Sequence, residues 1–300
     1  MKKTIMIALS ILITLCACTA AYGAIHPQDY VFQSFTEPNL FVNVFIAEPV
    51  KWYNLGEPEK SIDIGAAVYV GDTFDDIQVY SVQYLESNMN FANAAFLSLP
   101  SGQITVIKGS YLFDFGLTLG ADHFSQDSYS FTMLSAGYRL GFEKGFALIS
   151  LDYGMDDYDS DIYGYELDAQ YDLEQGRIFG EVYSIKDEDT YIMIGSLYPV
   201  RENLTLGAKY QTYDEYTGYE IGATWVQDAL ALNGTIGQTL FEDFFYKIGG
   251  TYAFSDSLSL GMDYGKNEYL DGGFAIRVKY TAGDFIVNFS LNMDYMPEIF

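Results

Sequence analysis

Residues Asn203–Gln227 read NLTLGAKYQTYDEYTGYEIGATWVQ, and apolar side chains occupy every second position on both sides of the central Asp214–Gly218. A strand directs successive side chains to opposite faces, so the stretch predicts two strands joined by a short connection. Each strand has one apolar and one polar face. The apolar positions are Leu204, Leu206, Ala208 and Tyr210 in the first strand, and Tyr219, Ile221, Ala223 and Trp225 in the second.

The same alternation recurs to the end of the chain, and no segment shows a sustained helical period. Further examples are Leu134–Leu140, Tyr163–Tyr171, Leu258–Tyr264, Phe274–Tyr280 and Phe285–Met293. Short acidic or glycine-containing breaks separate these runs, so successive strands are expected to be antiparallel neighbours in a meander. No composition shift or linker interrupts residues 61–300. We therefore expect one all-β domain there.

The number of strands is less well defined than their existence. Segmentation from Ser61 gives 17 candidates if both Asn90–Ser98 and Gln103–Gly109 count. Bacterial single-chain barrels have an even number, so we merge or drop one candidate and expect about 16 strands, with 14 to 18 allowed. The longer breaks, 121–127 and 155–160, would then lie on the periplasmic side with the C-terminus. That is opposite to the usual arrangement, so the count stays open.

The first 23 residues have the features of a secretory signal peptide. Lys2 and Lys3 precede the uncharged run Thr4–Ala17, and small residues lead to a cleavage site near Gly23 or Ala24. A lipoprotein signal with Cys18 acylated is the alternative. Residues 24–60 contain four of the seven prolines. We expect them to form an irregular arm that covers one barrel end, lies in the lumen or adds a strand.

The charge of the chain excludes one class of partner. The chain has 15 Lys and Arg, 41 Asp and Glu and a net charge of −26; loss of Lys2 and Lys3 with the signal leaves 13 − 41 = −28. Such a surface repels nucleic acid, so no nucleic-acid partner is expected. The two cysteines, Cys16 and Cys18, both lie in the signal. The mature chain therefore lacks disulfide and thiol chemistry.

The composition of the polar face indicates whether that face lies on the outside of the protein or lines a water-filled interior. Apolar and polar residues also alternate along the strands of a soluble β-sandwich, but the outer face of such a sandwich is usually rich in Lys and Glu. Here the polar positions are mostly Gly, Ser and Thr with single charges of both signs, which suits a crowded, water-filled interior. The expected lumen-lining residues, which would set selectivity, are Arg139, Lys209, Lys247, Arg277, Lys279, Glu166, Asp168, Glu220 and Asp263.

Aromatic residues tend to stand at the end of each run of alternating apolar residues. A Tyr or Trp ring prefers the headgroup zone of a bilayer, so these positions predict a girdle at the membrane–water interface. An open sheet edge in lipid would leave backbone groups unpaired, so the sheet is expected to close. The predicted interface aromatics are Tyr138, Tyr210, Trp225, Tyr252, Tyr264 and Tyr280.

With these features, residues 61–300 resemble the bacterial outer-membrane β-barrels and, more loosely, the porin-like ones. The resemblance rests on the signal, on small-Gly patterns before an aromatic and on the C-terminal Phe300. It implies a closed antiparallel up-and-down barrel in the outer membrane, contact with outer-membrane lipid and insertion by the barrel assembly machinery. The chain departs from that class at its end, where alternation stops at Met293 and Pro297 follows.

The residues offer little for catalysis. His26 and His123 are the only histidines, and a Ser-His-Asp hydrolase would need His123 with Ser125 and either Asp122 or Asp127. We place His123 in a loop and do not expect an enzyme.

An acidic stretch resembles part of a calcium-binding loop. Asp157, Asp159 and Asp161 have suitable spacing, but Ile162 stands where an EF-hand needs glycine. A solvated acidic hairpin loop is the simpler interpretation. We expect no cofactor beyond loosely bound Ca²⁺ or Mg²⁺.

Three functions remain after these exclusions. The first is a porin-like channel through which small hydrophilic solutes diffuse. The second is a non-transporting outer-membrane barrel, either an adhesin, a structural protein or an occluded barrel. The third is a soluble exported β protein that binds an apolar ligand. A homo-oligomer is compatible with each of them.

Overall fold

A computed structural model describes residues 61–70, 77–86, 90–99, 102–126, 129–156, 161–238, 240, 244–255, 257–267 and 272–293. The predicted signal peptide (residues 1–23) and the predicted arm (residues 24–60) lie outside these residues, and both stay predictions. The strands are β1 (Ser61–Val70), β2 (Ile77–Glu86), β3 (Asn90–Leu99), β4 (Gly102–Leu112), β5 (Leu117–Gln126), β6 (Tyr129–Phe142), β7 (Gly145–Asp156), β8 (Asp161–Leu173), β9 (Gly176–Ile185), β10 (Thr190–Arg201), β11 (Leu204–Tyr213), β12 (Tyr216–Gln227), β13 (Leu230–Gln238), β14 (Phe245–Ser255), β15 (Leu258–Asn267), β16 (Gly273–Ala282) and β17 (Phe285–Met293). The described residues contain no helix long and apolar enough to cross a membrane.

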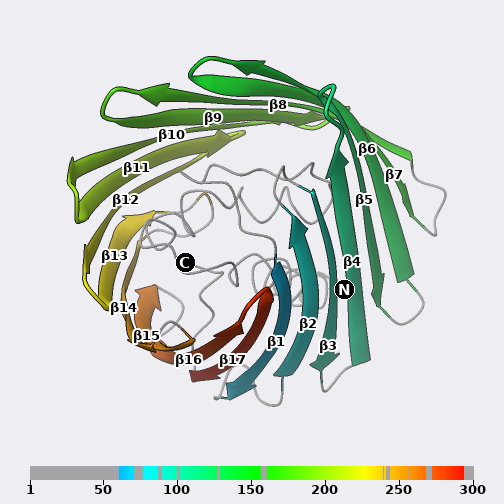
Figure 1. Cartoon of the computed structure of the whole chain (residues 1–300). Coiled ribbons are helices and arrows are strands. Elements are labelled where there is room, and N and C mark those ends of the chain that lie inside the picture. Colours follow the sequence, from blue (N-terminus) through cyan, green and yellow to red (C-terminus); the bar gives the residue numbers. More distant parts are fainter. Residues whose placement is uncertain are drawn as a thin grey trace.

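All of these strands belong to one closed sheet. Each strand pairs antiparallel with the next along the chain, as the alternation predicts. The ring is closed by β1 and β17, which pair in parallel from Ile62 opposite Phe285 to Val70 opposite Met293. Both edges of every strand are therefore hydrogen-bonded, and the strands form a continuous ring (Figure 1). The predicted closed, all-β up-and-down barrel is confirmed.

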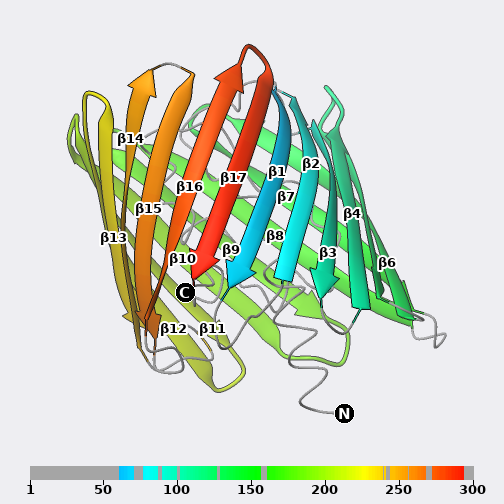
Figure 2. The same ribbon diagram turned by 90° about the horizontal axis from the view of Figure 1, so that it is seen from below.

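The strand number is 17 rather than 16, within the expected range of 14 to 18. Asn90–Leu99 and Gly102–Leu112 are separate strands, so neither candidate should have been merged. A closed ring in which all neighbours are antiparallel needs an even number of strands. This ring can have an odd number because β1 and β17 point the same way and pair in parallel (Figure 2). The break expected at 121–127 is also wrong, because β5 runs through Gln126.

The hairpin at the centre of the quoted stretch forms as expected. β11 and β12 meet at Asp214-Glu215, where Asp214 has a φ of 53°. Asp tolerates this left-handed conformation better than most residues, and it suits a two-residue hairpin turn. In the resulting register, Lys209 lies opposite Glu220 and Tyr210 lies opposite Tyr219.

The two faces of the sheet are reversed relative to those of a soluble sandwich. On β12, Ile221 is 59% exposed, whereas its neighbour Glu220 is only 3% exposed. The same contrast recurs around the ring: Leu, Ile and aromatic side chains cover the outside, and Ser, Thr and charged side chains are buried on the inside. Water would penalise such a surface, but hydrocarbon would not. The outer face is therefore suited to lipid.

Candidate functional site: the inner wall of the barrel

The nine charged residues expected in the lumen all lie on the inner face of their strands. Five are buried, namely Glu166, Asp168, Lys209, Glu220 and Asp263. Four are half-buried, namely Arg139, Lys247, Arg277 and Lys279. Each alternates with outward-facing apolar neighbours, so the polar wall follows from the period of two.

Opposite charges pair across neighbouring strands of this wall. Lys209 Nζ lies 2.6 Å from Glu220 Oε1, and both side chains are buried. Arg277 pairs with Asp263. Arg177 pairs with Asp172, and this pair was not predicted. Pairing offsets part of the cost of removing these charges from water.

A glycine makes room for one of these pairs. Gly249 lies directly opposite Asp263 on β15 and opposite Asn233 on β13. A Cβ atom on Gly249 would lie 1.9 Å from Asp263 Oδ1 and 2.8 Å from Asn233 Oδ1. The glycine therefore leaves space for two polar side chains that lean over β14.

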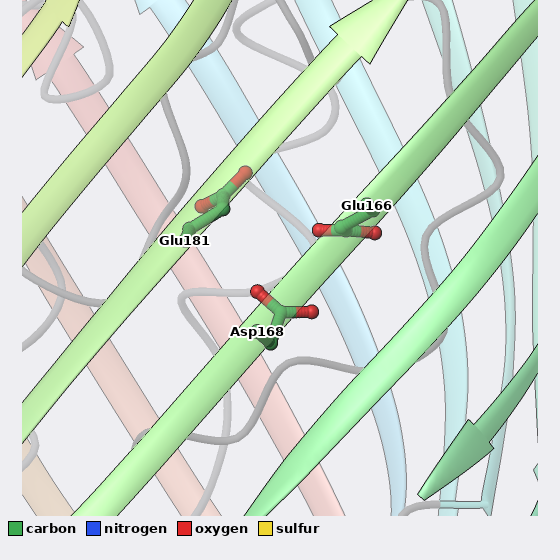
Figure 3. Close-up of side chains that lie close together, drawn as sticks. All are labelled: Glu166, Asp168 and Glu181. Atoms are coloured by element: carbon green, nitrogen blue, oxygen red, sulfur yellow. The ribbon is translucent and has the colours of Figure 1, made fainter.

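Three carboxylates converge on the inner face of β8 and β9. Glu166 and Asp168 project from β8 and Glu181 projects from β9 (Figure 3). One carboxylate oxygen from each lies within 4.8 Å of the others, and all three residues are buried. Ser150 Oγ donates a hydrogen bond of 3.3 Å to Glu166 Oε2. Carboxylate oxygens at this spacing are of the type that holds Ca²⁺ or Mg²⁺.

Sequence reasoning missed Glu181 because its proximity to Glu166 and Asp168 depends on strand register. Asp168 lies directly opposite Glu181 in the β8–β9 pairing, which the sequence alone does not specify. The expected acidic triplet lies elsewhere: Asp157 and Asp159 fall outside the described residues, as does the side chain of Asp161. A role for that triplet in binding Ca²⁺ or Mg²⁺ therefore stays a prediction.

The remaining inner charges divide the wall into sectors. The β7–β9 sector carries Asp152 in addition to the three carboxylates and the Asp172–Arg177 pair, whereas β14–β16 carries Lys247, Lys279 and the Arg277–Asp263 pair. These two groups of strands lie on opposite sides of the ring (Figure 1). Arg139 on β6, the strand that precedes β7, lies over the Phe146 ring, with its Cζ 4.5 Å from the ring centroid. The net charge of the inner wall is therefore negative in the first sector and positive in the second.

Part of the inner wall is apolar, which the alternation did not predict. We call the buried residues Phe131, Met133, Phe179, Tyr183, Tyr191, Met193, Leu197 and Leu240 the inner apolar cluster. They come from β6, β9, β10 and the β13–β14 connection. The signal was present at Tyr191–Ile194, where four apolar residues follow one another, because such a run predicts a strand covered on both faces.

The inner apolar cluster packs closely over glycines. The Phe179 ring lies against Gly195, where a Cβ atom would come within 2.3 Å of the ring, and Phe131 covers Gly154 in the same way. Tyr191 connects the cluster to the polar wall, because its hydroxyl donates a hydrogen bond of 3.3 Å to Gln211 Oε1.

The six predicted interface aromatics lie on the outer face at two levels. Tyr138, Trp225, Tyr252 and Tyr280 stand toward the end where β1 begins, and Tyr210 and Tyr264 stand toward the opposite end. The tyrosines are 38–51% exposed and Trp225 is half-buried. Further rings join each level. Phe142 stacks near Tyr171 with centroids 6.2 Å apart, and Tyr153 and Tyr163 lie 5.2 Å apart at the other end.

The two levels are spaced suitably for a bilayer. Tyr163 and Tyr171 both face outward on β8. The eight residue steps from Tyr163 to Tyr171 correspond to about 27 Å along a strand, or roughly 20 Å along the axis at a tilt of about 40°. An outer apolar band of about 25 Å is typical of membrane barrels.

The residues considered for hydrolysis that the structure describes all lie on β5. His123 lies in β5 rather than in a loop, and its Nδ1 is 2.9 Å from Thr132 Oγ1 on β6. Asp122 precedes it in the same strand and therefore points to the opposite face. Ser125 follows two positions later in β5, and Asp127 lies outside the described residues.

The closed sheet, the polar inner wall and the apolar outer face together define a transmembrane β-barrel. No protein-family model matches the chain, and no curated protein matches it. Among solved structures, a mutant of Rhodopseudomonas blastica porin is similar to it, at 10% identity and a TM-score of 0.47 over 67% of this chain and 88% of the porin. The KdgM porin is 12% identical, with a TM-score of 0.32 over 61% of this chain and 94% of that one. Omp33 of Acinetobacter baumannii is 13% identical, with a TM-score of 0.36 over 57% and 87%.

Proposed function

We propose that the protein is a porin-like channel of the outer membrane through which small hydrophilic solutes diffuse. One observation carries the proposal: the same strands that present Ile221 and Tyr219 to the outside bury Glu220 and Thr224 on the inside. A closed barrel of this size has an interior wide enough for water. A polar wall would lower the cost of transferring a hydrated solute through the lumen.

We further propose that the channel prefers cations. The whole chain carries a net charge of −26, and Glu166, Asp168 and Glu181 gather on one inner wall. Clustered carboxylates beside a pore raise the local concentration of cations and lower that of anions. Lys209 and Glu220, in contrast, neutralise each other within 2.6 Å and would contribute little to selectivity.

The selectivity is tested by the reversal potential in planar bilayers under a KCl gradient. The unmodified protein should be cation-selective. Replacing the three carboxylates with amides, as Glu166→Gln, Asp168→Asn and Glu181→Gln, should shift the reversal potential toward zero. The matched control Lys209→Gln with Glu220→Gln removes one charge of each sign and should leave it unchanged. Anion selectivity of the unmodified protein would contradict the proposal.

A second candidate function is a barrel that does not transport. The inner apolar cluster favours it, because Met133, Tyr191 and Met193 are inward-facing yet at most 1% exposed. Part of the interior is therefore filled. Deleting residues 24–60 separates the candidates: an arm that occludes the lumen predicts a larger conductance for the deletion variant than for the full mature chain. A folded barrel that conducts in neither form would be an adhesin or structural barrel.

The third candidate, a soluble exported protein that binds an apolar ligand, fits the outer face poorly. Leu151 and Met262 are 67% and 62% exposed on that face, and a protein in water seldom exposes such a continuous apolar surface. Release from cell envelopes by high salt or alkaline carbonate, without detergent, would favour this candidate. A requirement for detergent would support the membrane barrel.

A further inference from the structure

The odd number of strands separates the two ends of the barrel domain. β1 and β17 run in the same direction and pair in parallel over nine positions, from Ile62–Phe285 to Val70–Met293. Both arrows point the same way where the two strands lie side by side (Figure 2). The chain thus enters the barrel at one rim, at Ser61, and leaves it at the opposite rim, after Met293.

The two rims differ in the length of their connections. At the rim where β1 begins, which we call the turn rim, six of the connections are two-residue turns, among them Glu143-Lys144 and Glu174-Gln175. At the opposite rim, the loop rim, the connections reach six residues, as between β1 and β2 and between β13 and β14. Bacterial outer-membrane barrels have short turns on the periplasmic side and longer loops outside.

We infer that the turn rim faces the periplasm and that β17 ends on the outer side of the membrane, so β1 begins and β17 ends on opposite sides. This inference rests on the proposed outer-membrane function. It also removes the conflict that an even strand count creates, in which the longer breaks would share the periplasmic side with the C-terminus. With 17 strands, the longer connections and the end of β17 share the outer rim.

This orientation places the more acidic rim outside. The connections of the loop rim contain about twice as many acidic residues as those of the turn rim, and Lys186 is their only basic residue. The described turns Lys186–Asp189 and Asp214-Glu215 belong to this rim. Acidic groups around a mouth attract cations from the adjoining solution. The outer entrance would therefore concentrate cationic rather than anionic solutes.

Single-cysteine labelling tests the orientation, because the mature chain contains no cysteine. Lys144→Cys marks the turn rim and Glu215→Cys marks the loop rim, and both native residues are exposed in two-residue turns. A membrane-impermeant maleimide should label Glu215→Cys in intact cells. It should label Lys144→Cys only after the outer membrane is permeabilised. The reverse pattern would overturn the inference.

An epitope tag after Phe300 tests the parallel closure separately. The tag should bind antibody on intact cells that also label at Glu215→Cys. If intact cells label at Glu215→Cys but the antibody binds the tag only after permeabilisation, the parallel closure is overturned. Conductance of the purified protein does not depend on which rim faces outward. A conducting protein with reversed labelling therefore refutes the orientation alone, whereas absence of the protein from the outer-membrane fraction refutes the proposed function and the orientation together.

Discussion

At the residue scale, Trp225 is placed to report on the membrane boundary. It faces outward near the end of β12, and Leu204 on β11 lies opposite it. An indole ring prefers the headgroup zone, where its apolar part is buried and its N–H stays wet. Trp52 and Trp225 are the only tryptophans, so Trp52→Phe leaves Trp225 as the single reporter.

We expect fluorescence of the Trp52→Phe variant to be quenched by brominated lipids after reconstitution. Quenching should be stronger with bromines near the headgroup than with bromines near the end of the acyl chain. The Trp225→Phe variant, which keeps Trp52, serves as the control for signal from the arm. Fluorescence that no brominated lipid quenches would place Trp225 away from lipid.

The pair of Lys209 and Glu220 is a second feature at this scale. Both side chains are at most 5% exposed, so removing one partner leaves the other charge buried without this ion pair. We expect Lys209→Met to cost about 3–5 kcal/mol in the free energy of unfolding. The double variant Lys209→Met, Glu220→Leu should regain most of that loss. Urea unfolding in lipid vesicles measures both, and an unaffected single variant would mean that water reaches the pair.

At the element scale, the packing of β9 against β10 depends on Gly195. The Phe179 ring occupies the space where a Cβ atom would lie, and the ring is only 3% exposed within the inner apolar cluster. It has little room to move aside. Overpacking of this kind typically costs about 1–3 kcal/mol, so we expect Gly195→Ala to destabilise the barrel by that amount.

Gly141 provides the matched control for this substitution. It also lies in a strand, but nothing lies within 4 Å of the position where its Cβ atom would be. Gly141→Ala should therefore change the unfolding midpoint little. Equal stability of the two variants would contradict the packing described for Phe179.

The strands and their faces could be predicted because alternation is a local property. Glu220 and Ile221 are adjacent, and in a strand adjacent side chains must point to opposite faces. The quoted hairpin, the polar wall and the aromatic levels all follow from this rule. Tyr191–Ile194 could not be assigned in the same way, because a continuous apolar run does not indicate which side packs inward.

Features that depend on register or closure could not be predicted from the sequence. The approach of Glu181 to Asp168 requires the β8–β9 pairing, which relates residues that no local pattern connects. The strand number depended on an assumption that the sheet closes with antiparallel edges. Parallel pairing of β1 and β17 is a long-range property, and nothing in either strand alone specifies it.

At the scale of the whole molecule, the barrel combines two opposing features. Its outer face and polar inner wall are suited to a water-filled passage through lipid. The inner apolar cluster, which reaches from β6 to Leu240 in the β13–β14 connection, fills part of the interior. The balance between these two features decides whether solutes pass.

Single-channel recording of the purified mature protein in planar bilayers tests this central claim most directly. A water-filled lumen with a charged wall predicts discrete, ohmic current steps in KCl, with a reversal potential on the cation-selective side. A folded barrel that inserts but carries no current, with residues 24–60 present or deleted, would contradict the channel and leave a closed outer-membrane barrel.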